Sequence, residues 1–550
     1  MSRSLPLFAL VLALCVAFIA RVEMSLRPGL WGDEIFSLAM ATGHSLEHPT
    51  AAADPALGDY VDPPGVVLSD RFRHYTEHDR PPAGSSRVLR AVLLSDTSPP
   101  LYYLLLHWWT RVAGTSDVAL RLLSLLTATL ALPFIWAIGK ELAGPKVAWT
   151  AALLYAFSPV SVFYSLEGRM YSLLWLLASA LAWQSLLLRR RGAKPALVTG
   201  WIVAAAGGML THYFFLFAWA AMLAWLLWRP GKLSRGTIVS MAGVVAFAIL
   251  PWYLQVPASL GRWRVSGRWL AEPLHWPGAV TRPFELAWSL LAGGSFWGGS
   301  PPVDLCLAVA YLALVVWIMG RGLLARVFAG DLLLLWLWVG ASVLGLVGFD
   351  VARHTSASLV PRYVLAALPA AMLLAAVGME QLPRKMHALF LSFVLLAWTA
   401  GLRPIVLDRA RPGAAYPALA ARLGGWARPS DLVLVHSIPS GVVGLSRYLS
   451  RPIPMASWIE RFGSRGNPHD LDVLLAGRKR VALVQVHNLG KSSLAETWLR
   501  SRWPIVREEV WVGSTNTLTS AVESLPPAQQ RERREHELIE IFYFDLSERR

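Results

Sequence analysis

The sequence is poor in cysteine and in charge and carries no phosphate-binding loop, and each absence narrows the class of protein. Only two of the 550 residues are cysteine, Cys15 and Cys306, and both lie in apolar segments. Two such thiols exclude a disulfide framework and a Cys/His zinc site. The lack of a Gly-rich phosphate loop argues against a nucleotide-binding fold. Charged residues make up 16% of the chain, whereas about 25% is usual for soluble proteins.

The chain has long hydrophobic runs instead. Hydrophobic residues make up 55%, in blocks of about 17 to 25 residues, a length that crosses a ~30 Å hydrocarbon core as a helix. The sequence therefore predicts a polytopic α-helical membrane protein. The first run, Leu5–Ala20, follows Arg3 as in a signal peptide, but no small-residue cleavage site precedes the charged stretch Arg21–Arg27. We expect an uncleaved first helix.

The formal net charge of +16 and the 26 tryptophans raise the question of nucleic-acid binding. The basic residues, however, cluster between the apolar blocks, and Trp and Tyr gather near block ends, as at the two surfaces of a membrane. No compact basic patch on a folded module is recognisable. We therefore expect a membrane-lipid environment and no nucleic-acid partner.

The basic connections predict the orientation of the spans. With the amino terminus in the cytoplasm, the short basic loops lie inside if Leu101–Val112, which is too short to cross comfortably, lies along the surface. Parity then favours about eleven spans. After a first helix over about Ser4–Ala20, the predicted spans are Val118–Ile138, Val147–Tyr164, Met170–Leu188, Ala196–Leu210, Phe214–Trp228, Ile238–Val256, Val303–Met319, Leu332–Phe349, Val364–Leu382 and His387–Leu402.

This topology places the long polar segments on the outer face. They are a first loop over residues 21–116, a loop of about Pro257–Pro302, and everything after about Arg403. The tail, residues 403–550, reads as a soluble α/β module after a membrane domain over residues 1–402. Its predicted strands are Leu432–His436, Val481–Val486, Val506–Val512 and Leu538–Phe544.

Two groups of charged residues are the sharpest candidates for chemistry. Asp33 and Glu34 lie about ten residues beyond the first span, where a carboxylate can meet substrates from the bilayer and from outside. The alternative is a solvated loop. Glu167 and Arg169 occupy a very short connection between two spans, and charges so near hydrocarbon are costly unless paired or needed. The alternative is an ion pair that marks the span boundary.

Three further outer-face strings carry candidate residues. Asp96 precedes two prolines and the surface helix with Tyr102, and it could serve only as a polar residue near that helix's start. His212 and Tyr213 lie at an outer turn, where an interface anchor is an alternative. Arg362 opens a span on the outer side, where an arginine can hold a lipid phosphate bidentately or simply reach the headgroups.

These strings, in this order, resemble bacterial glycosyltransferase family 39, the membrane-embedded group related to protein O-mannosyltransferases and to the aminoarabinose transferase of lipid A. The resemblance covers roughly residues 1–400. Two features depart from it: the stretch Ser45–Leu94 is longer than expected, and Gly168 stands where the family often has Ala. The matching residues are Asp33-Glu34, Asp96, Tyr102-Tyr103, His107-Trp108, Gly114, Arg121-Leu122-Leu123-Ser124, Gly139, Ser158-Pro159, Glu167-Gly168-Arg169-Met170-Tyr171, Thr211-His212-Tyr213 and Arg362-Tyr363.

The resemblance implies a GT-C fold, which is a transmembrane bundle with its active site on the outer face of the bacterial cytoplasmic membrane. It implies an inverting transfer of a sugar from a polyprenyl-phosphate carrier to a protein, lipid or glycan, without a cofactor or metal. Asp33 would be the base, with Glu34 and Glu167 orienting the acceptor. Donor phosphate and lipid would be held by Arg362, Arg169 and Tyr363, with Arg262, Arg264 and Arg268 as further candidates, and the cavity lined by Asp96, Tyr102, Tyr171, His212 and Tyr213.

Two other classes remain open from the sequence. A transporter or flippase for lipid-linked sugars also needs many spans, but it normally places charges at the midplane between repeats. A binding protein of envelope assembly with a degenerate core would not need the acidic residues. The sugar, the acceptor and the function of the tail are not encoded in any motif.

Overall fold

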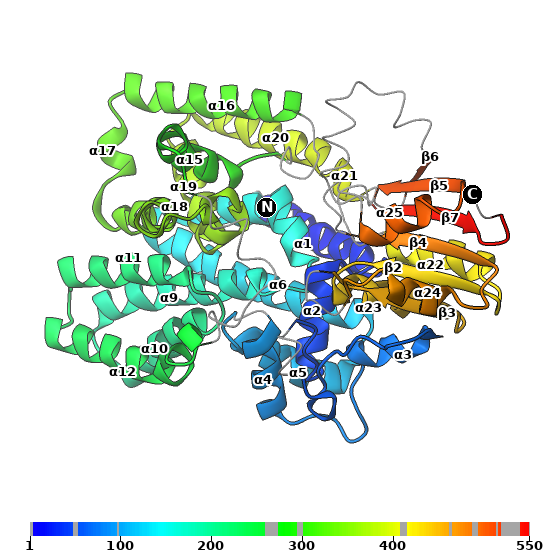
Figure 1. The fold of residues 1–550 in the computed structure, drawn as a ribbon. Helices are drawn as coiled ribbons and strands as arrows, with labels where there is room; N and C mark the ends of the chain where they lie inside the picture. Colours follow the sequence, from blue (N-terminus) through cyan, green and yellow to red (C-terminus); the bar gives the residue numbers. More distant parts are fainter. Residues whose placement is uncertain are drawn as a thin grey trace.

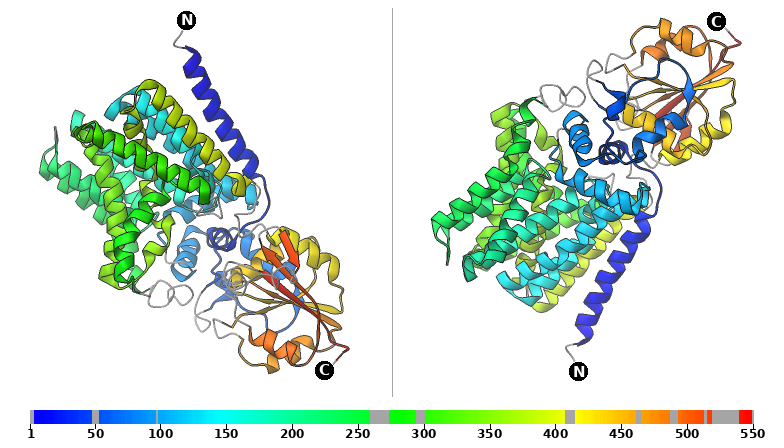
Figure 2. Two further views of the ribbon diagram at one scale, coloured as in Figure 1. Left: turned by 90° about the horizontal axis from the view of Figure 1, so that it is seen from above. Right: turned by 90° about the horizontal axis from the view of Figure 1, so that it is seen from below.

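The computed structural model describes residues 4–47, 53–95, 98–258, 273–293, 301–406, 415–460, 465–486, 493–512, 515–518 and 539–548. It consists of a large helical part and a smaller α/β part, joined through the segments that follow the first helix (Figure 1). The first helix extends from the bundle so that its amino-terminal end points away from the sheet (Figure 2). The sheet therefore lies at one end of the helical part, as expected for a module on a single membrane face.

Six helical stretches of the described chain are long and apolar enough to cross a membrane. Helices α7 and α8 together form a seventh, bent candidate, and α1 and α20 lie where the first and last spans are predicted. The total of eleven spans stays a prediction. The bundle helices are α1 (Ser4–Ser25), α6 (Asp117–Ala143), α7 (Pro145–Phe157), α8 (Pro159–Ser165), α9 (Tyr171–Arg191), α10 (Pro195–Met209), α11 (Phe215–Trp228), α12 (Arg235–Tyr253), α16 (Pro301–Gly320), α18 (Leu333–Arg353), α19 (Leu368–Glu380) and α20 (Arg384–Gly401).

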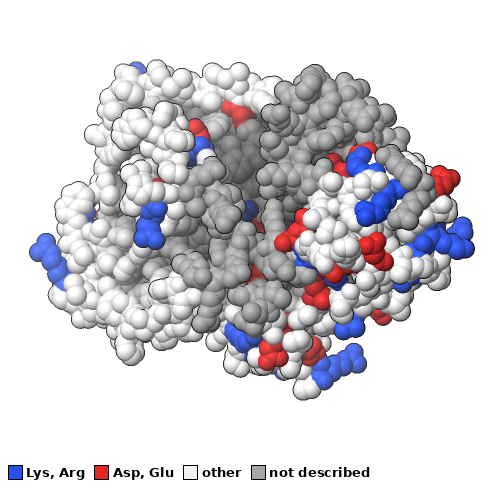
Figure 3. Space-filling model, viewed as in Figure 1, with Lys and Arg blue, Asp and Glu red and all other residues white. Residues whose placement is uncertain are grey.

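The surface of the helical part agrees with a lipid environment. In the view of Figure 3, charged side chains gather over the sheet and its helices, whereas the described atoms over the long helices are almost all uncharged. Large apolar side chains also stand exposed there, such as Phe247 at 79% and Leu389 at 73%. A water-soluble domain rarely exposes a contiguous apolar surface of this extent.

One predicted span is two helices rather than one. The block Val147–Tyr164 is interrupted between α7 and α8, which meet at 58°. Pro159 has no backbone N–H and disfavours helical conformation in the residue before it. Ser158 ends α7 and caps α8, its hydroxyl accepting from Ser161 N at 3.5 Å. The bend carries the chain directly into the short connection that holds Glu167.

The first outer loop contains several helices, in agreement with the extracytoplasmic loop helices that the resemblance to the GT-C fold implies. Helix α2 begins at Gly32, so Asp33 and Glu34 lie in the first turn of a helix and not in a solvated loop. Helix α5 lies where the surface helix Leu101–Val112 is predicted and starts after Pro100; its place along the membrane surface stays a prediction. The other elements of this loop are η2 (Pro55–Leu57), β1 (Val67–Leu68), α3 (Asp70–Arg73), η3 (His74–Thr76) and α4 (Ser85–Ser95), beside α2 (Gly32–Ala41) and α5 (Leu101–Ala113).

Short elements also fill the later connections. Helix α15 (Trp276–Ser289) lies inside the predicted outer loop Pro257–Pro302. Two 3-10 turns precede α19, and the second of them carries Arg362. These connecting elements are α17 (Leu324–Val327), η5 (Gly330–Leu332), η6 (Ala357–Leu359), η7 (Pro361–Ala367) and α21 (Arg403–Val406).

The tail supplies six strands of a seven-stranded mixed sheet in the order β1-β3-β2-β4-β7-β5-β6. Strands β3, β2 and β4 are parallel, and the remaining pairs are antiparallel. The strands are β2 (Asp431–His436), β3 (Pro454–Trp458), β4 (Arg480–Gln485), β5 (Ile505–Val512), β6 (Thr515–Leu518) and β7 (Ile539–Asp545), and the helices are α22 (Ala415–Trp426), α23 (Pro439–Tyr448), α24 (His469–Leu475) and α25 (Leu494–Arg500).

Helices cover both faces of this sheet, which explains its buried strand runs. Along β2, Val433 and Val435 face a core shared with α22 and α23, whereas Leu432 and Leu434 face α24 and α25. Strands β2, β4, β5 and β7 lie where the sequence predicts strands. Strands β1, β3 and β6 are additional.

Strand β1 comes from the first outer loop and forms an edge of the sheet. Val67 pairs with Met455 in antiparallel register. Nearby, Arg465 donates to the carbonyl of Pro63 at 2.6 Å, and Ser69 N donates to Ile453 O at 2.9 Å. Part of the unexpectedly long stretch Ser45–Leu94 therefore ties the outer loop to the tail. The proposed boundary at residues 402/403 stays a prediction.

Candidate active site

The amino-terminal turn of α2 organises the candidate site. Trp31 precedes the helix in extended conformation, and its backbone N–H donates to Glu34 Oε2 at 3.2 Å. Acidic side chains in a first turn are stabilised by the free N–H groups and the helix dipole. Successive helical residues project about 100° apart, so the two adjacent carboxyl groups enter different environments.

Glu34 points inward and is 3% exposed. Its Oε1 accepts from Gly168 N at 2.8 Å, and its two oxygens face the guanidinium of Arg121 at 3.4 Å each. Arg121 also donates to the carbonyls of Arg27 and Gly29. Glu34 thus fixes α2 to α6 and to the loop that holds Glu167. A further role in orienting an acceptor stays a prediction.

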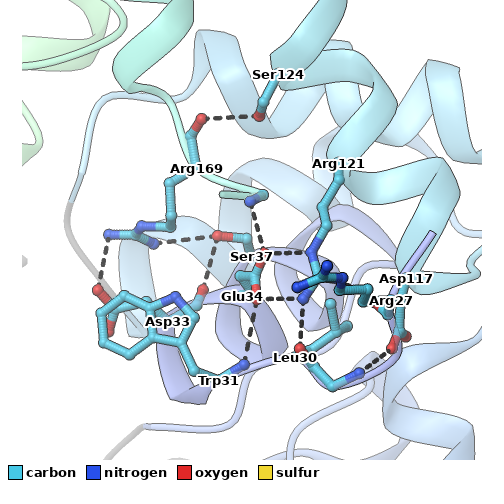
Figure 4. Close-up of polar contacts among 12 residues, drawn as sticks. Arg27, Leu30, Trp31, Asp33, Glu34, Ser37, Asp117, Arg121, Ser124 and Arg169 are labelled. Atoms are coloured by element: carbon cyan, nitrogen blue, oxygen red, sulfur yellow. Dashed lines mark hydrogen bonds and ion pairs between the residues drawn. The ribbon is translucent and has the colours of Figure 1, made fainter. Parts of the chain in front are cut away.

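Asp33 points the other way, and its side chain is 27% exposed. Its Oδ2 lies 3.9 Å from Arg169 Nη2 and 3.6 Å from Arg362 Nη2. Figure 4 shows the guanidinium of Arg169 beside the Asp33 carboxylate, next to the ring of Trp31. The structure therefore brings together the predicted base and both predicted phosphate-binding arginines.

Arg169 is held in place by hydroxyl groups from three other elements. Its Nη1 donates to Ser37 Oγ at 3.1 Å and to Tyr103 Oη at 3.2 Å, and its backbone carbonyl accepts from Ser124 Oγ at 3.2 Å. Ser37 lies one helical turn beyond Asp33 on α2. Arg169 is therefore fixed beside Asp33 although its own connection is only five residues long.

Glu167 is buried beside these charges, with 5% of its surface exposed. Within the described parts of the chain, its Oε2 has no hydrogen-bond partner. Burial raises the pKa of this carboxyl from 4.5 to about 8, against the opposing effect of Arg362. Glu167 therefore keeps its proton at neutral pH and can donate a hydrogen bond.

The segment before η7 positions Arg362. Asp350 is fully buried near the end of α18 and accepts from Thr355 Oγ1 at 2.7 Å, Ala357 N at 2.8 Å and Ser358 N at 2.7 Å. These bonds shape the turn that leads to Arg362. The Arg362 guanidinium then lies 5.8 Å from the centre of the Trp31 ring, and its side chain is 28% exposed.

The aromatic residues predicted for the cavity or, in the case of Tyr363, for the donor lie in different places. Tyr171, His212 and Tyr363 form a chain, with ring centres 6.4 Å apart between the first two and 5.4 Å between the last two. Tyr213 instead contacts α12, where its hydroxyl accepts from Trp252 Nε1 at 3.3 Å. Tyr102 is buried against Ser124 at 3.4 Å.

The remaining predicted residues are not placed. Asp96 and the three arginines Arg262, Arg264 and Arg268 lie outside the described residues. Among the residues that the structure describes, no group of three or more His, Cys, Asp or Glu side chains could hold a metal ion.

The α/β part contacts the same segment through Asp117 at the start of α6. Asp117 Oδ2 accepts from Gly29 N at 2.8 Å and from Tyr448 Oη at 2.6 Å. The Tyr448 hydroxyl in turn accepts from Leu30 N at 2.7 Å, and Arg447 Nη2 lies 3.0 Å from Asp117 Oδ1. Residues of α23 therefore hold the backbone that leads into α2.

Comparisons with known proteins agree with this arrangement. Residues 97–254 match the family described as dolichyl-phosphate-mannose-protein mannosyltransferase, which confirms the predicted resemblance over that segment. Among solved structures, ArnT from Cupriavidus metallidurans bound to undecaprenyl phosphate is 13% identical, covers 98% of this chain and 98% of its own, and gives a TM-score of 0.52. The chain has a GT-C glycosyltransferase fold.

Other comparisons add little to the assignment of the GT-C fold. The archaeal oligosaccharyltransferase AglB from Archaeoglobus fulgidus, in complex with an inhibitory peptide and a dolichol-phosphate, is 11% identical. It covers 94% of this chain and 75% of its own, with a TM-score of 0.42, which is too low to carry an argument. No curated protein matches the chain.

The charged residues predicted from the sequence lie together in the structure, but the residues that support them were not predicted. Arg121 and Tyr103 are among the residues that match the family, yet nothing in the sequence indicated that Arg121 contacts Glu34 or that Tyr103 contacts Arg169. The spacing of Ser37 four residues after Asp33 was a usable signal, because such positions share one face of a helix. Asp117 and Tyr448 are 331 residues apart, a separation that no local pattern bridges.

The glycine at position 168 follows from the packing of the connection. A Cβ there would lie 2.4 Å from Leu120 Cγ, so Gly168→Ala should lower the free energy of unfolding by about 1–3 kcal/mol. Thermal unfolding of purified protein measures the effect. Leu120→Ala in the Gly168→Ala background should recover part of the loss, because the two sites are in contact. Strictly additive losses would contradict this explanation.

The raised pKa of Glu167 predicts a pH dependence of stability. The stabilisation that its proton provides is complete below pH 4.5 and is lost as the pH rises through about 8. Between these values the wild type should lose stability relative to Glu167→Gln, which cannot ionise. Unfolding midpoints of both proteins from pH 5 to 9 measure this difference. Parallel curves would show that Glu167 does not change its charge over this range.

Proposed function

We propose that this protein is an inverting glycosyltransferase that moves a sugar from a polyprenyl-phosphate carrier to an acceptor hydroxyl on the outer face of the membrane. The observation that carries the proposal is the contact of Asp33 with Arg169 and Arg362 at 3.9 and 3.6 Å. This contact places a proton acceptor beside two cations that can bind a phosphate, at the outer end of the helical bundle. The match of residues 97–254 to a mannosyltransferase family supports the same chemistry.

The reaction assigns a separate task to each charge. The acceptor oxygen attacks the anomeric carbon while the bond from that carbon to the phosphate oxygen breaks. Asp33 takes the proton of the acceptor hydroxyl, and the carrier leaves as a polyprenyl phosphate with one additional negative charge. Arg169 and Arg362 stabilise this charge, which develops only in the transition state and is therefore where fixed cations lower the barrier.

The same two arginines explain how the base becomes available. Without substrate their guanidinium groups lie against Asp33. The donor phosphodiester carries one negative charge, as the carboxylate does, and its free oxygens accept hydrogen bonds from both guanidinium groups, so binding of the donor gives the arginines a second anionic partner and weakens their interaction with the carboxylate. The protonated Glu167 is a donor for a sugar or acceptor hydroxyl. Tyr363 is the partly exposed ring against which a sugar can stack, whereas Tyr171 and His212, which it adjoins, are buried.

Asp33→Asn should lower the turnover about 10²–10⁴-fold, because the amide cannot take the proton, while the unfolding temperature changes little at this partly exposed site. Transfer of radiolabel from a panel of polyprenyl-phosphate sugars to a crude envelope acceptor measures it. Asp472→Asn, on the exposed surface of α24, is the matched control. Undiminished transfer by Asp33→Asn would show that Asp33 is not the base. If the wild type binds the carrier but transfers no sugar from any donor, a transport function is favoured instead.

Arg362→Ala should weaken the binding of polyprenyl phosphate roughly tenfold to a hundredfold, the value of a hydrogen bond to a charged group. Arg362→Lys should restore only part of it, because an ammonium group keeps the charge but not the planar fork. Titration of detergent-purified protein with the carrier measures the dissociation constant. Arg353→Ala, at an exposed position on the same face, should bind normally. Equal affinity of wild type and Arg362→Ala would contradict the assignment.

A further inference from the structure

A second candidate site lies away from Asp33, in an apolar groove along α1. The groove has a volume of about 450 Å³ and is bounded by α1, α6 and α7. On α1 it extends from Val11 to Arg21, about 15 Å at 1.5 Å per residue and thus about half of a ~30 Å hydrocarbon core. Figure 2 shows that α1 diverges from the bundle toward its amino terminus.

Most of the groove is lined by apolar side chains, and polar side chains line one of its ends. Phe18, Leu132 and Trp149 are among its apolar lining residues. Helix α6 runs antiparallel to α1, and α7 runs parallel to it. Leu132 and Trp149 therefore lie beside the amino-terminal part of α1, deeper in the membrane. Tyr155, Ser161 and Arg21 follow at the end nearer the candidate active site. This pattern matches a lipid chain with its headgroup at the membrane surface.

Arg21 is buried at this end with 7% of its surface exposed. It donates through Nε to Ser165 Oγ at 3.1 Å, through Nη1 to Ala17 O at 3.2 Å and through Nη2 to Ser161 Oγ at 3.3 Å. All three acceptors are neutral. In the described portion of the chain no carboxylate lies within 4.0 Å of this guanidinium, whereas Arg121, equally buried, has Glu34.

A buried guanidinium without a counter-ion is energetically costly. Arg21 uses three of its five N–H donors on these neutral groups, and two remain. A phosphate would supply both the missing negative charge and acceptors for those donors. Leu12 and Ile19 on the same helix are 52% and 62% exposed, so the groove opens toward lipid rather than toward water.

We propose that this groove binds an anionic phospholipid of the surrounding bilayer, with the phosphate on Arg21 and one acyl chain between α1 and α7. The site is separate from the Asp33 centre and does not rest on the proposed function. Arg21 also binds Ser165, which lies two residues before Glu167. A lipid bound in the groove would therefore help to hold in place the short connection that carries Glu167.

Native mass spectrometry of the full chain in detergent tests the proposal. Phosphatidylglycerol should be retained by the wild type and should bind about tenfold more weakly to Arg21→Gln, because a charge-assisted hydrogen bond is worth this much or more. Phosphatidylcholine, which carries no net charge, should be retained to a similar extent by the wild type and by Arg21→Gln. Arg321→Gln is the matched control, since Arg321 is an exposed arginine that stacks on Trp317.

A second variant separates binding from folding. Leu14→Trp fills the groove at a partly exposed position and leaves Arg21 intact, so it should also reduce phosphatidylglycerol retention. Equal retention by wild type, Arg21→Gln and Leu14→Trp would overturn the site. Displacement by inorganic phosphate alone would overturn the role of the groove. Displacement by polyprenyl phosphate at lower concentration than phosphatidylglycerol would show that the carrier, and not a bilayer phospholipid, is the occupant.

Discussion

The buried contact between Glu34 and Arg121 is the interaction on which the rest of the site depends. Both side chains are almost fully inaccessible, at 3% and 1% exposure, and loss of one partner from such a pair typically costs about 3–5 kcal/mol. Glu34 also holds Gly168 N, and Arg121 holds two carbonyls ahead of α2. Three segments from distant parts of the chain are thereby fixed at one point, and the direction of Asp33 follows from that arrangement.

The two adjacent carboxyl groups illustrate how a helix separates structural from chemical tasks. Had the pair lain in a loop, both carboxylates could have turned to water. The helix instead commits Glu34 to the interior and leaves Asp33 at the open side with Arg169 and Arg362. The close fit of Gly168 against Leu120 belongs to the same packing, because the N–H of Gly168 reaches Glu34 only when the connection lies against α6.

Much of the helical part could be predicted from the sequence, because the length of apolar runs and the basic residues between them are imposed by the bilayer. The strands β2 and β4 were equally readable, since a strand covered on both faces is continuously apolar. Helix α2 was missed because its ten residues are stabilised by Arg121 and α23 more than by any local periodicity. The break at Ser158 and the contact of Asp117 with Tyr448 depend on tertiary packing in the same way.

Four arginines near the candidate site, Arg21, Arg121, Arg169 and Arg362, show how one type of side chain serves different purposes. Arg121 is neutralised by Glu34 inside the protein and holds three segments together, whereas Arg169 and Arg362 both approach the carboxylate of Asp33 at the open side. Arg21 donates to neutral oxygens of Ala17, Ser161 and Ser165. The surroundings of each guanidinium therefore differ with its position.

The bond between Asp117 and Tyr448 also has a consequence for biogenesis. The backbone of Gly29 and Leu30 emerges early in translation, but the hydroxyl that holds it belongs to a helix made more than four hundred residues later. The bundle can insert into the membrane during synthesis, yet the entry to α2 reaches its final form only after the tail has been made and has folded against it. In a truncated or stalled chain, the segment before Asp33 and Glu34 would lack its contacts with Tyr448. The site would therefore become ordered only in the full-length protein.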